Sequence, residues 1–406
     1  MILTLAAALA VLPTAASAAG AATANLAAPS ECQRMEEMGL SRALIDQIDP
    51  ATCSPTLAKM PTARSSFGVV ATGNGRVFAV GGWSPHAKPI VTEYEPFTIG
   101  RWDPSALATV EEFDPKANKW TTKASMLTAR TGVGVAEGFD GKIYAIGGYS
   151  PERGYLNTVE AYDPVENTWV KRASMPTPRY APGVVRAING KILAFGGYSE
   201  DYDEYGNTTG RYHVTVEEYD PIEDSWSRRT DMPTGRYGMG AVSGADGLVY
   251  AIGGFNLHKA TFKFQELDAV TGMLETFTGH SPRLAYLTTV ESYDPTTDVW
   301  EVQPSMSYGR TGLVAVRSAF GDLDFDPWVT RKILAIGGEG RDGVAVATVE
   351  EFDLVTKTWR TLANLSTARA NLGAALDQTN YKRIFVIGGV HPELGHLATV
   401  EEIALR

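Results

Sequence analysis

The chain has only two cysteines, no excess of positive charge and no long apolar segment. Lys and Arg number 36 against 47 Asp and Glu, so the formal net charge over the 406 residues is −11. Proteins that bind the phosphate backbone of nucleic acids need a basic face, and this composition argues against that class of partner. A membrane-spanning helix needs roughly 18 or more consecutive apolar residues, and no segment meets that length. We therefore expect neither a nucleic-acid partner nor a membrane span.

The first residues carry features of a secretory signal. An apolar run over Met1–Leu12 is too short to cross a bilayer, and the small residues Ala16–Ala18 fit a cleavage site. No Lys or Arg precedes the apolar run, which departs from the usual signal, and a disordered Ala-rich leader is the alternative. We predict a signal peptide over residues 1–18 and a secreted, periplasmic or extracellular protein.

Both cysteines, Cys32 and Cys53, follow shortly after this signal. In an exported protein two nearby cysteines commonly pair, and closing a loop of this size contributes about 3 kcal/mol by restricting the unfolded chain. Ser30 and Gln33 fit a helix capping box. We predict that residues 19–56 form an N-terminal helical hairpin joined by a Cys32–Cys53 disulfide, with a free-thiol role as the alternative.

The rest of the chain repeats one pattern six times. Each unit contains a short apolar run that ends in a Gly-Gly pair, and a Val-Glu pair follows it. The shortest distance between two Val-Glu pairs is 159 − 110 = 49 residues. A repeat of about 50 residues with strand-like runs and turn residues indicates a propeller array rather than several unrelated domains. The six pairs begin at Val110, Val159, Val216, Val290, Val349 and Val400.

A second set of residues recurs in five of the six units. An aromatic residue and an Asp follow the Val-Glu pair, and a Trp stands six residues beyond the Asp. This combination resembles the kelch repeat, and the resemblance covers about residues 57–406. It implies an all-β fold, a six-bladed β-propeller of four-stranded kelch blades. The tryptophans are Trp120, Trp169, Trp226, Trp300 and Trp359.

The second unit illustrates how the strands of a blade are expected to divide. The Gly-rich segment 130–136 suits an innermost strand, where blades converge and side chains must be small. We predict a second strand over 143–148, a third over 158–163 and an outer strand over 168–172, in which Trp169 buries a large area between blades. The Gly-Gly pair is expected at a strand end with positive backbone angles or close backbone approach.

The two ends of the repeated region do not form whole units. The chain stops after a third-strand pattern at 400–406, and residues 57–64 resemble an outer strand with no blade before it. We predict that the N- and C-terminal strands pair to complete one blade, because this pairing removes open sheet edges and closes the ring. The expected product is a monomeric propeller over residues 57–406.

Binding residues are expected where the units differ, because the repeated positions build the scaffold. The spacing from Gly-Gly to the next Val-Glu is 159 − 148 = 11 residues at its shortest, but 110 − 82 = 28 in the first unit and 290 − 254 = 36 in the fourth. These loops share one face with the residues after each repeat arginine, and they are rich in aromatic residues, which are enriched at binding sites. Packing of these side chains back onto the propeller is the alternative. The candidate binding residues are Trp83, His86, Trp102, Tyr180, Tyr198, Tyr202, Tyr237, Phe255 and His258.

Three groups of polar residues are candidates for chemistry. All six histidines lie in second-to-third-strand loops without the spacing of metal ligands, so we predict no metal site and no cofactor. The acidic run 200–204 does not fit a calcium loop and is interpreted as solvated. One arginine per unit precedes the innermost strand, and we interpret this set as scaffold rather than as a carboxylate-binding ring. These arginines are Arg64, Arg130, Arg179, Arg236, Arg310 and Arg369.

Glu339 and Arg341 lie in one loop and are the candidate catalytic residues of an alternative function. In having a Glu–Arg pair near the mouth of the ring, the sequence is similar to the periplasmic sialic-acid mutarotases, which are six-bladed kelch-like rings. A copper-radical oxidase is excluded, because its chemistry needs a cysteine beside the pocket and both cysteines here precede the ring. The sequence thus predicts a secreted, non-catalytic module that binds a protein or glycan through the loop-rich face. The alternative is a carbohydrate-active enzyme, a sugar mutarotase or isomerase, that uses acidic residues and arginine at the propeller mouth.

Overall fold

The residues that the computed structural model describes begin at Leu57, the first residue of the second of two units in the chain. The predicted signal peptide and the disulfide-linked segment 19–56 lie outside the described residues. At residues 202, 208, 258–267 and 274–284 only the backbone is described. The described residues are 57–85, 106–202, 208–267, 274–318, 331–379, 381 and 383–405.

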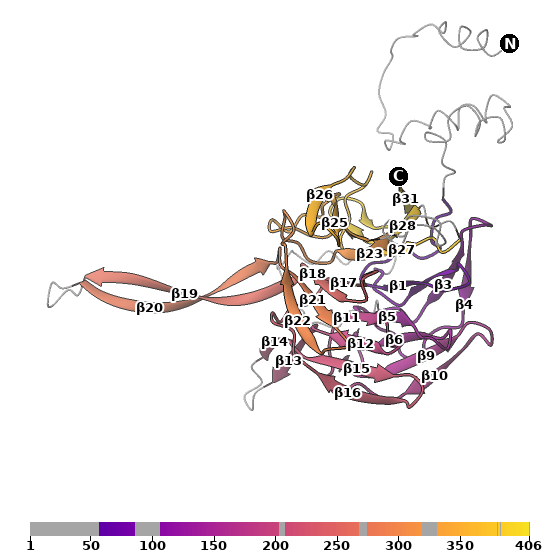
Figure 1. Cartoon of the computed structure of the whole chain (residues 1–406), viewed down its shortest axis with the longest axis horizontal. Helices are drawn as coiled ribbons and strands as arrows, with labels where there is room; N and C mark the ends of the chain where they lie inside the picture. Colours follow the sequence, from indigo (N-terminus) through magenta and orange to yellow (C-terminus); the bar gives the residue numbers. More distant parts are fainter. Residues whose placement is uncertain are drawn as a thin grey trace, which may run out of the picture. The chain divides into compact units, whose positions relative to one another are not determined.

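Six antiparallel sheets in these residues form the blades of a propeller (Figure 1). Five sheets have four strands, and the sixth has three within the described part of the chain. The described secondary structure is entirely β, which confirms the predicted all-β, six-bladed fold. The strands of blades one to three are β1 (Gly68–Ala71), β2 (Val77–Val80), β3 (Val110–Asp114), β4 (Lys119–Lys123); β5 (Gly134–Glu137), β6 (Ile143–Ile146), β9 (Val159–Asp163), β10 (Thr168–Arg172); β11 (Gly183–Arg186), β12 (Ile192–Phe195), β15 (Val216–Asp220) and β16 (Ser225–Arg229). Those of blades four to six are β17 (Gly240–Ser243), β18 (Val249–Ile252), β21 (Val290–Asp294), β22 (Val299–Gln303); β23 (Val314–Ser318), β24 (Lys332–Ile336), β25 (Val349–Asp353), β26 (Thr358–Thr361); β27 (Gly373–Leu376), β28 (Arg383–Ile387) and β31 (Val400–Ala404).

Blade two follows the strand division that the sequence predicts. Its strands lie in the order β10-β9-β6-β5, and β5 faces the innermost strands of the neighbouring blades. The second strand is fully buried on both faces, because adjacent blades cover both sides of the sheet. Gly147 and Gly148 follow it with φ of 66° and 98°, a conformation that a Cβ atom disfavours. This confirms the predicted role of the Gly-Gly pair as a strand end.

The tryptophan of each outer strand joins one blade to the blade before it. Trp169 is 8% exposed, and its Nε1 donates a hydrogen bond of 2.9 Å to the backbone oxygen of Ala124 in blade one. Its ring packs against Tyr162 with centroids 5.1 Å apart. The buried indole therefore contributes both apolar area and a specific polar contact between blades.

The six repeat arginines are fully buried, and each pairs with the Glu of the Val-Glu motif in the blade that it precedes. Arg130 pairs with Glu160 and donates to the backbone oxygens of Gly147 (3.0 Å) and Thr158 (3.1 Å). This arrangement confirms the scaffold interpretation, because an internal carboxylate already occupies each guanidinium. The pairs are Arg64–Glu111, Arg130–Glu160, Arg179–Glu217, Arg236–Glu291, Arg310–Glu350 and Arg369–Glu401.

Residues 57–64 bridge blade six and blade one. The backbone nitrogen of Met60 donates to the oxygen of Ala398 in blade six at 2.8 Å. The backbone oxygen of Ala58 accepts a hydrogen bond of 2.9 Å from Trp120 Nε1 in blade one. Tryptophan bonds of the same kind link blades one to five in succession. The bond from Met60 matches those that the residue after the outer strand makes within each other blade, so the first described residues stand where an outer strand of blade six would end. Residues 57–64 form no β-strand themselves, so the predicted pairing of an N-terminal strand with β31 is not found among the described residues.

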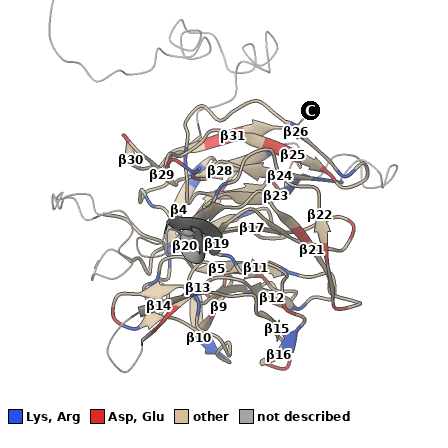
Figure 2. Cartoon of the chain, turned by 90° about the vertical axis from the view of Figure 1, so that its left-hand side faces the viewer, with Lys and Arg blue, Asp and Glu red and all other residues tan. Residues whose placement is uncertain are grey.

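In the described residues, the connections after the second strands of blades two, three, four and six contain β-hairpins, where the sequence predicts loops alone. The hairpin of blade four has two strands of 13 residues and projects from the ring (Figure 1). Figure 2 views the molecule from the side on which this hairpin projects, and acidic and basic residues are interspersed over the blades there. The hairpin strands are β7 (Tyr149–Ser150), β8 (Gly154–Tyr155), β13 (Tyr198–Tyr202), β14 (Thr208–Tyr212), β19 (Phe255–Leu267), β20 (Leu274–Tyr286), β29 (Val390–His391) and β30 (Gly395–His396).

Candidate functional site

A closed ring of backbone hydrogen bonds surrounds the propeller axis at the hairpin side. In every blade the residue two places after the repeat arginine donates its N–H to the carbonyl of its counterpart in the preceding blade, with N···O distances of 2.7–3.4 Å. All six of these residues have positive φ, between 47° and 62°. The ring fixes the backbone around the axis, so the flanking side chains are held on rigid elements. Its members are Ser66, Gly132, Ala181, Gly238, Gly312 and Asn371.

The same positions line a cavity of about 360 Å³ on the axis. The residue directly after each repeat arginine forms a β-bridge with the residue directly after the Gly-Gly pair of the same blade, for example Tyr180 with Tyr198 and Tyr237 with Phe255. This pairing confirms that the blade connections and the second-to-third-strand loops share one face. The cavity is therefore assembled from all six blades, each contributing a short segment.

Four aromatic residues line one side of the cavity: Tyr149, Tyr180, Tyr237 and Phe255, called here the aromatic arc. The ring centroids of Tyr180 and Tyr237 are 6.1 Å apart, and those of Tyr237 and Phe255 are 5.7 Å apart. Tyr198 packs behind the arc, with its ring 5.6 Å from that of Tyr237. Rings packed in these tilted and edge-to-face arrangements form an apolar wall with hydroxyl groups at its edge.

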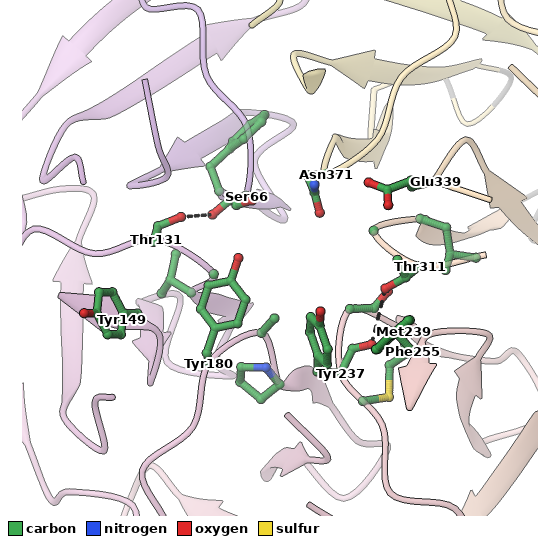
Figure 3. A pocket seen from close by; sticks show the side chains of 18 of the residues that line it. Ser66, Thr131, Tyr149, Tyr180, Tyr237, Met239, Phe255, Thr311, Glu339 and Asn371 are labelled. Carbon is green, nitrogen blue, oxygen red and sulfur yellow. Dashed lines mark hydrogen bonds between the residues drawn. The ribbon is translucent and has the colours of Figure 1, made fainter. Parts of the chain in front are cut away.

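The hydroxyl groups of Tyr180 and Tyr237 remain protonated at neutral pH, because their pKa values are raised. Burial raises the pKa of Tyr180, against a smaller opposing effect of its hydrogen bond with Ser66. Burial also raises the pKa of Tyr237, and the nearby Tyr180, Tyr212 and Glu339 raise it further. Both phenols point into the opening with Asn371 and Glu339 (Figure 3). They present hydrogen-bond donors beside an apolar wall.

Glu339 lies on blade five, next to the blade that carries Phe255 and across the opening from Tyr180 (Figure 3), and it is the one acidic or basic side chain among the described residues that line the cavity. Its Oε1 accepts a hydrogen bond of 3.2 Å from the hydroxyl of Tyr286 at the base of the blade-four hairpin. Burial raises the pKa of Glu339, opposed by the bond from Tyr286 and reinforced by the charge of Asp342. Arg341 is exposed and is not among the residues that line the cavity. The structure thus does not bring the two candidate catalytic residues together in one pocket.

The structure places the nine candidate binding residues in different surroundings. Tyr180, Tyr237 and Phe255 line the cavity, whereas Tyr198 is buried behind them. Trp83 is partly buried and packs edge-on against His396, with centroids 4.4 Å apart, away from the cavity lining. At two other positions only the backbone is described, and a further two lie outside the described residues. The backbone-only positions are Tyr202 and His258, and those outside are His86 and Trp102.

Several lining residues were missed from the sequence. Ser66, Thr131, Thr311 and Asn371 come from the connections between blades, and Thr131 and Thr311 donate to backbone oxygens of the preceding blade. A signal was present, because these residues stand one or two places after a repeat arginine in every unit. The high aromatic content of the long loops favours them as binding segments. The small polar residues after the repeat arginines, by contrast, are typical of positions that build the scaffold.

The opposite end of the axis carries a second cavity of about 440 Å³ with a different charge. Arg186 there pairs with Glu137 at 3.6 Å, and its guanidinium carbon lies 4.9 Å from the ring centre of Phe139. Arg317 also lines this end, and burial together with the nearby Arg186 lowers its pKa. The two mouths of the propeller therefore differ, with a carboxylate at one and arginines at the other.

His213 is a buried histidine that has a hydrogen-bonding partner within the protein. It is 4% exposed, and its Nε2 lies 2.9 Å from Ser199 Oγ. Burial lowers its pKa to about 4, with nearby Arg179 and Arg211 acting in the same direction, so the imidazole is neutral at pH 7. In the described part of the chain, no three His, Cys, Asp or Glu side chains gather in a way that would hold a metal ion.

The fold and the repeated residues define a six-bladed β-propeller of kelch repeats, and the chain is a kelch-repeat protein. The kelch motif matches residues 131–176, 179–233, 279–307 and 329–366. Over 201 residues the chain is 29% identical to Kelch domain-containing protein 8B of Rattus norvegicus, and equally to that of Mus musculus. These matches cover 48% of this chain and 47% of each relative, so the chain spans about half the length of the curated relatives it matches.

Kelch propellers typically serve as protein-interaction modules. The described residues contain no helix with the length and apolar character needed to cross a membrane. The matched repeats account for the scaffold, whereas the cavity lining varies from blade to blade.

Proposed function

We propose that this protein is a monomeric, non-catalytic interaction module that binds a protein partner through the hairpin side of the propeller. The aromatic arc is the observation that carries this proposal. Four aromatic rings gathered on a rigid frame, with hydroxyl groups at the edge, have the composition of a binding hot spot. The long blade-four hairpin adjoins this site through Phe255 and Tyr286 and adds strand surface for a partner.

The cavity offers less support for the sugar-isomerising alternative. Acid–base catalysis on a sugar needs at least one positioned proton donor and one acceptor of suitable pKa. Glu339 is a single carboxylate, and Arg341 stands outside the lining. A glycan ligand would use the same aromatic wall, and it is an outcome of the experiment below rather than a separate proposal.

Tyr237→Ala is expected to weaken partner binding about 30-fold or more, because a hot-spot aromatic contributes roughly 2 kcal/mol or more to an interface. Partners are captured from extracellular extracts on the immobilised protein and identified by mass spectrometry. Their affinities are then measured with purified components. A glycan array on the same preparation tests for carbohydrate binding.

The matched control is Phe139→Ala, which removes an aromatic side chain at the opposite mouth. It should leave affinity unchanged. A second variant replaces residues 258–283 with a short turn and keeps both Phe255 and Tyr286 in place; a partner that uses the hairpin binds this variant more weakly. Loss of binding in Phe139→Ala with full binding in Tyr237→Ala would place the interface on the other face and overturn the proposal.

We also propose that the chain is exported and that Cys32 and Cys53 form a disulfide in the mature protein. The apolar run and Ala16–Ala18 support export, and the spacing of the only two cysteines supports pairing. Mass spectrometry of freshly secreted, non-reduced protein should find a new N-terminus near residue 19 and one peptide pair two hydrogens lighter than the free thiols. Two alkylatable thiols in that material would contradict the disulfide.

A further inference from the structure

We propose that the axial cavity on the hairpin side binds a cationic group, a lysine or arginine side chain of the partner, with Glu339 as its counterion and the aromatic arc as its wall. This inference rests on the proposed function and specifies the chemistry of the group that the partner inserts. The opposing face of the propeller, with its arginines, would repel the same group.

The charge of the cavity is the first reason. Within the described lining, Glu339 is the sole charged side chain, and no Lys, Arg or His balances it. The repeat arginines, which come closest to this level of the ring, are each paired with a buried glutamate. A carboxylate in a partly enclosed site gains most from a ligand that supplies the missing positive charge.

The aromatic arc is the second reason. Tyr180 and Tyr237 lie across the opening from the carboxylate, and Phe255 lines the cavity from the blade next to that of Glu339 (Figure 3). A cation over an aromatic face is attracted by the negative potential of the ring, and the attraction grows when the site excludes water. An uncharged ligand would use the wall but not the carboxylate, whereas an anion would be repelled by Glu339.

The position of Glu339 is the third reason. The hydroxyl of Tyr286 holds one carboxylate oxygen at 3.2 Å, and the side chain points into the opening. A cavity of about 360 Å³ lies at the small end of the range for ligand pockets, so it accommodates one extended side chain or a small head group rather than a folded element. The net charge of −11 adds long-range attraction for a basic partner.

The test uses 1-butylammonium chloride, with 1-butanol as its neutral counterpart, and the full-length protein. Binding is followed by saturation-transfer NMR and by calorimetry. Wild type should bind butylammonium and bind butanol much more weakly. Glu339→Gln should weaken butylammonium binding roughly tenfold or more, because a charge-assisted hydrogen bond is replaced by a neutral one.

The matched control is Glu137→Gln, which removes one acidic group at the opposite mouth and so changes the net charge equally. It should leave butylammonium binding unchanged. Binding should also fall as the pH is lowered through the raised pKa of Glu339, because protonation removes the counterion while the amine stays charged. The groups that face Glu339 in this titration are Tyr286, Tyr237 and Asp342.

Three results would overturn the inference: equal binding by wild type and Glu339→Gln, equal binding of butanol and butylammonium, or no binding of butylammonium. If Glu339→Gln does not fold, the comparison of butanol with butylammonium on the wild-type protein still tests whether the cavity prefers a cation. A partner whose affinity depends on Tyr237 but not on Glu339 would defeat this inference and leave the proposed function standing. A partner that ignores Tyr237 would defeat the proposed function itself.

Discussion

Deletion of residues 400–406 should abolish cooperative folding of the entire ring. The deletion removes β31, leaves β28 with an unpaired edge and strips Arg369 of its partner Glu401. Ala398, which accepts a backbone hydrogen bond from Met60 in the segment that bridges to blade one, then no longer leads into a paired strand. The facing surfaces of two neighbouring blades then lose their cover, so the expected loss is comparable to the whole stability of a domain, about 5–15 kcal/mol.

Urea unfolding followed by tryptophan fluorescence measures this effect. The control is removal of residues 258–283, a longer deletion confined to the projecting hairpin. That control should unfold at the same urea concentration as the wild type. A normal transition in the protein that lacks residues 400–406 would contradict closure of the ring by its two ends.

Arg130→Met should destabilise the protein by about 3–5 kcal/mol, because it leaves a buried carboxylate without its counterion. Arg130 is fully buried, and it also donates to the backbone oxygens of Gly147 and Thr158. Methionine has a similar length, so the loss is mainly electrostatic and polar rather than a cavity. Denaturant midpoints and slopes for wild type and variant provide the free-energy difference.

The double variant Arg130→Met/Glu160→Met separates the buried charge from the other contributions. Replacing both partners with apolar side chains removes the uncompensated carboxylate, so the double variant should be more stable than Arg130→Met alone. The destabilisation that remains then reports the backbone oxygens of Thr128, Gly147 and Thr158, which have lost a donor, together with the N–H of Leu127, which has lost its acceptor on Glu160. A double variant less stable than the single one would show that Glu160 has a stabilising role apart from its arginine.

Much of the fold could be predicted, because the strands and turns of a kelch blade are specified by residues that lie close together in the sequence. The alternation around Val159 and Tyr162, the turn after Asp163 and the buried Trp169 each follow from neighbours within a few residues. The Gly-Gly pair predicts a positive φ from its own chemistry, without reference to the rest of the chain. Repetition of the same signal six times made the ring architecture unambiguous.

The hairpins and the cavity were less accessible, because both depend on pairing across distance. The segments 255–267 and 274–286 were recognised as long and aromatic, but their register of thirteen residue pairs is a property of two strands together. Polar and apolar residues alternate in part of this region, as in Thr261–Phe264, and this alternation indicates a strand rather than the predicted loop. The sequence predicts that Glu339 acts together with Arg341, whereas the side chain that hydrogen-bonds to Glu339 is that of Tyr286.

The amino-acid sequence by itself determined that this protein is a kelch propeller with a buried arginine in every blade, because each blade repeats the same short-range pattern of strands, turns and packing residues. Only the tertiary structure decided what the axial cavity contains. Tyr180, Tyr237, Glu339 and Asn371 are separated by up to 371 − 180 = 191 residues, and they meet because ring closure brings one short segment of every blade to the same axis.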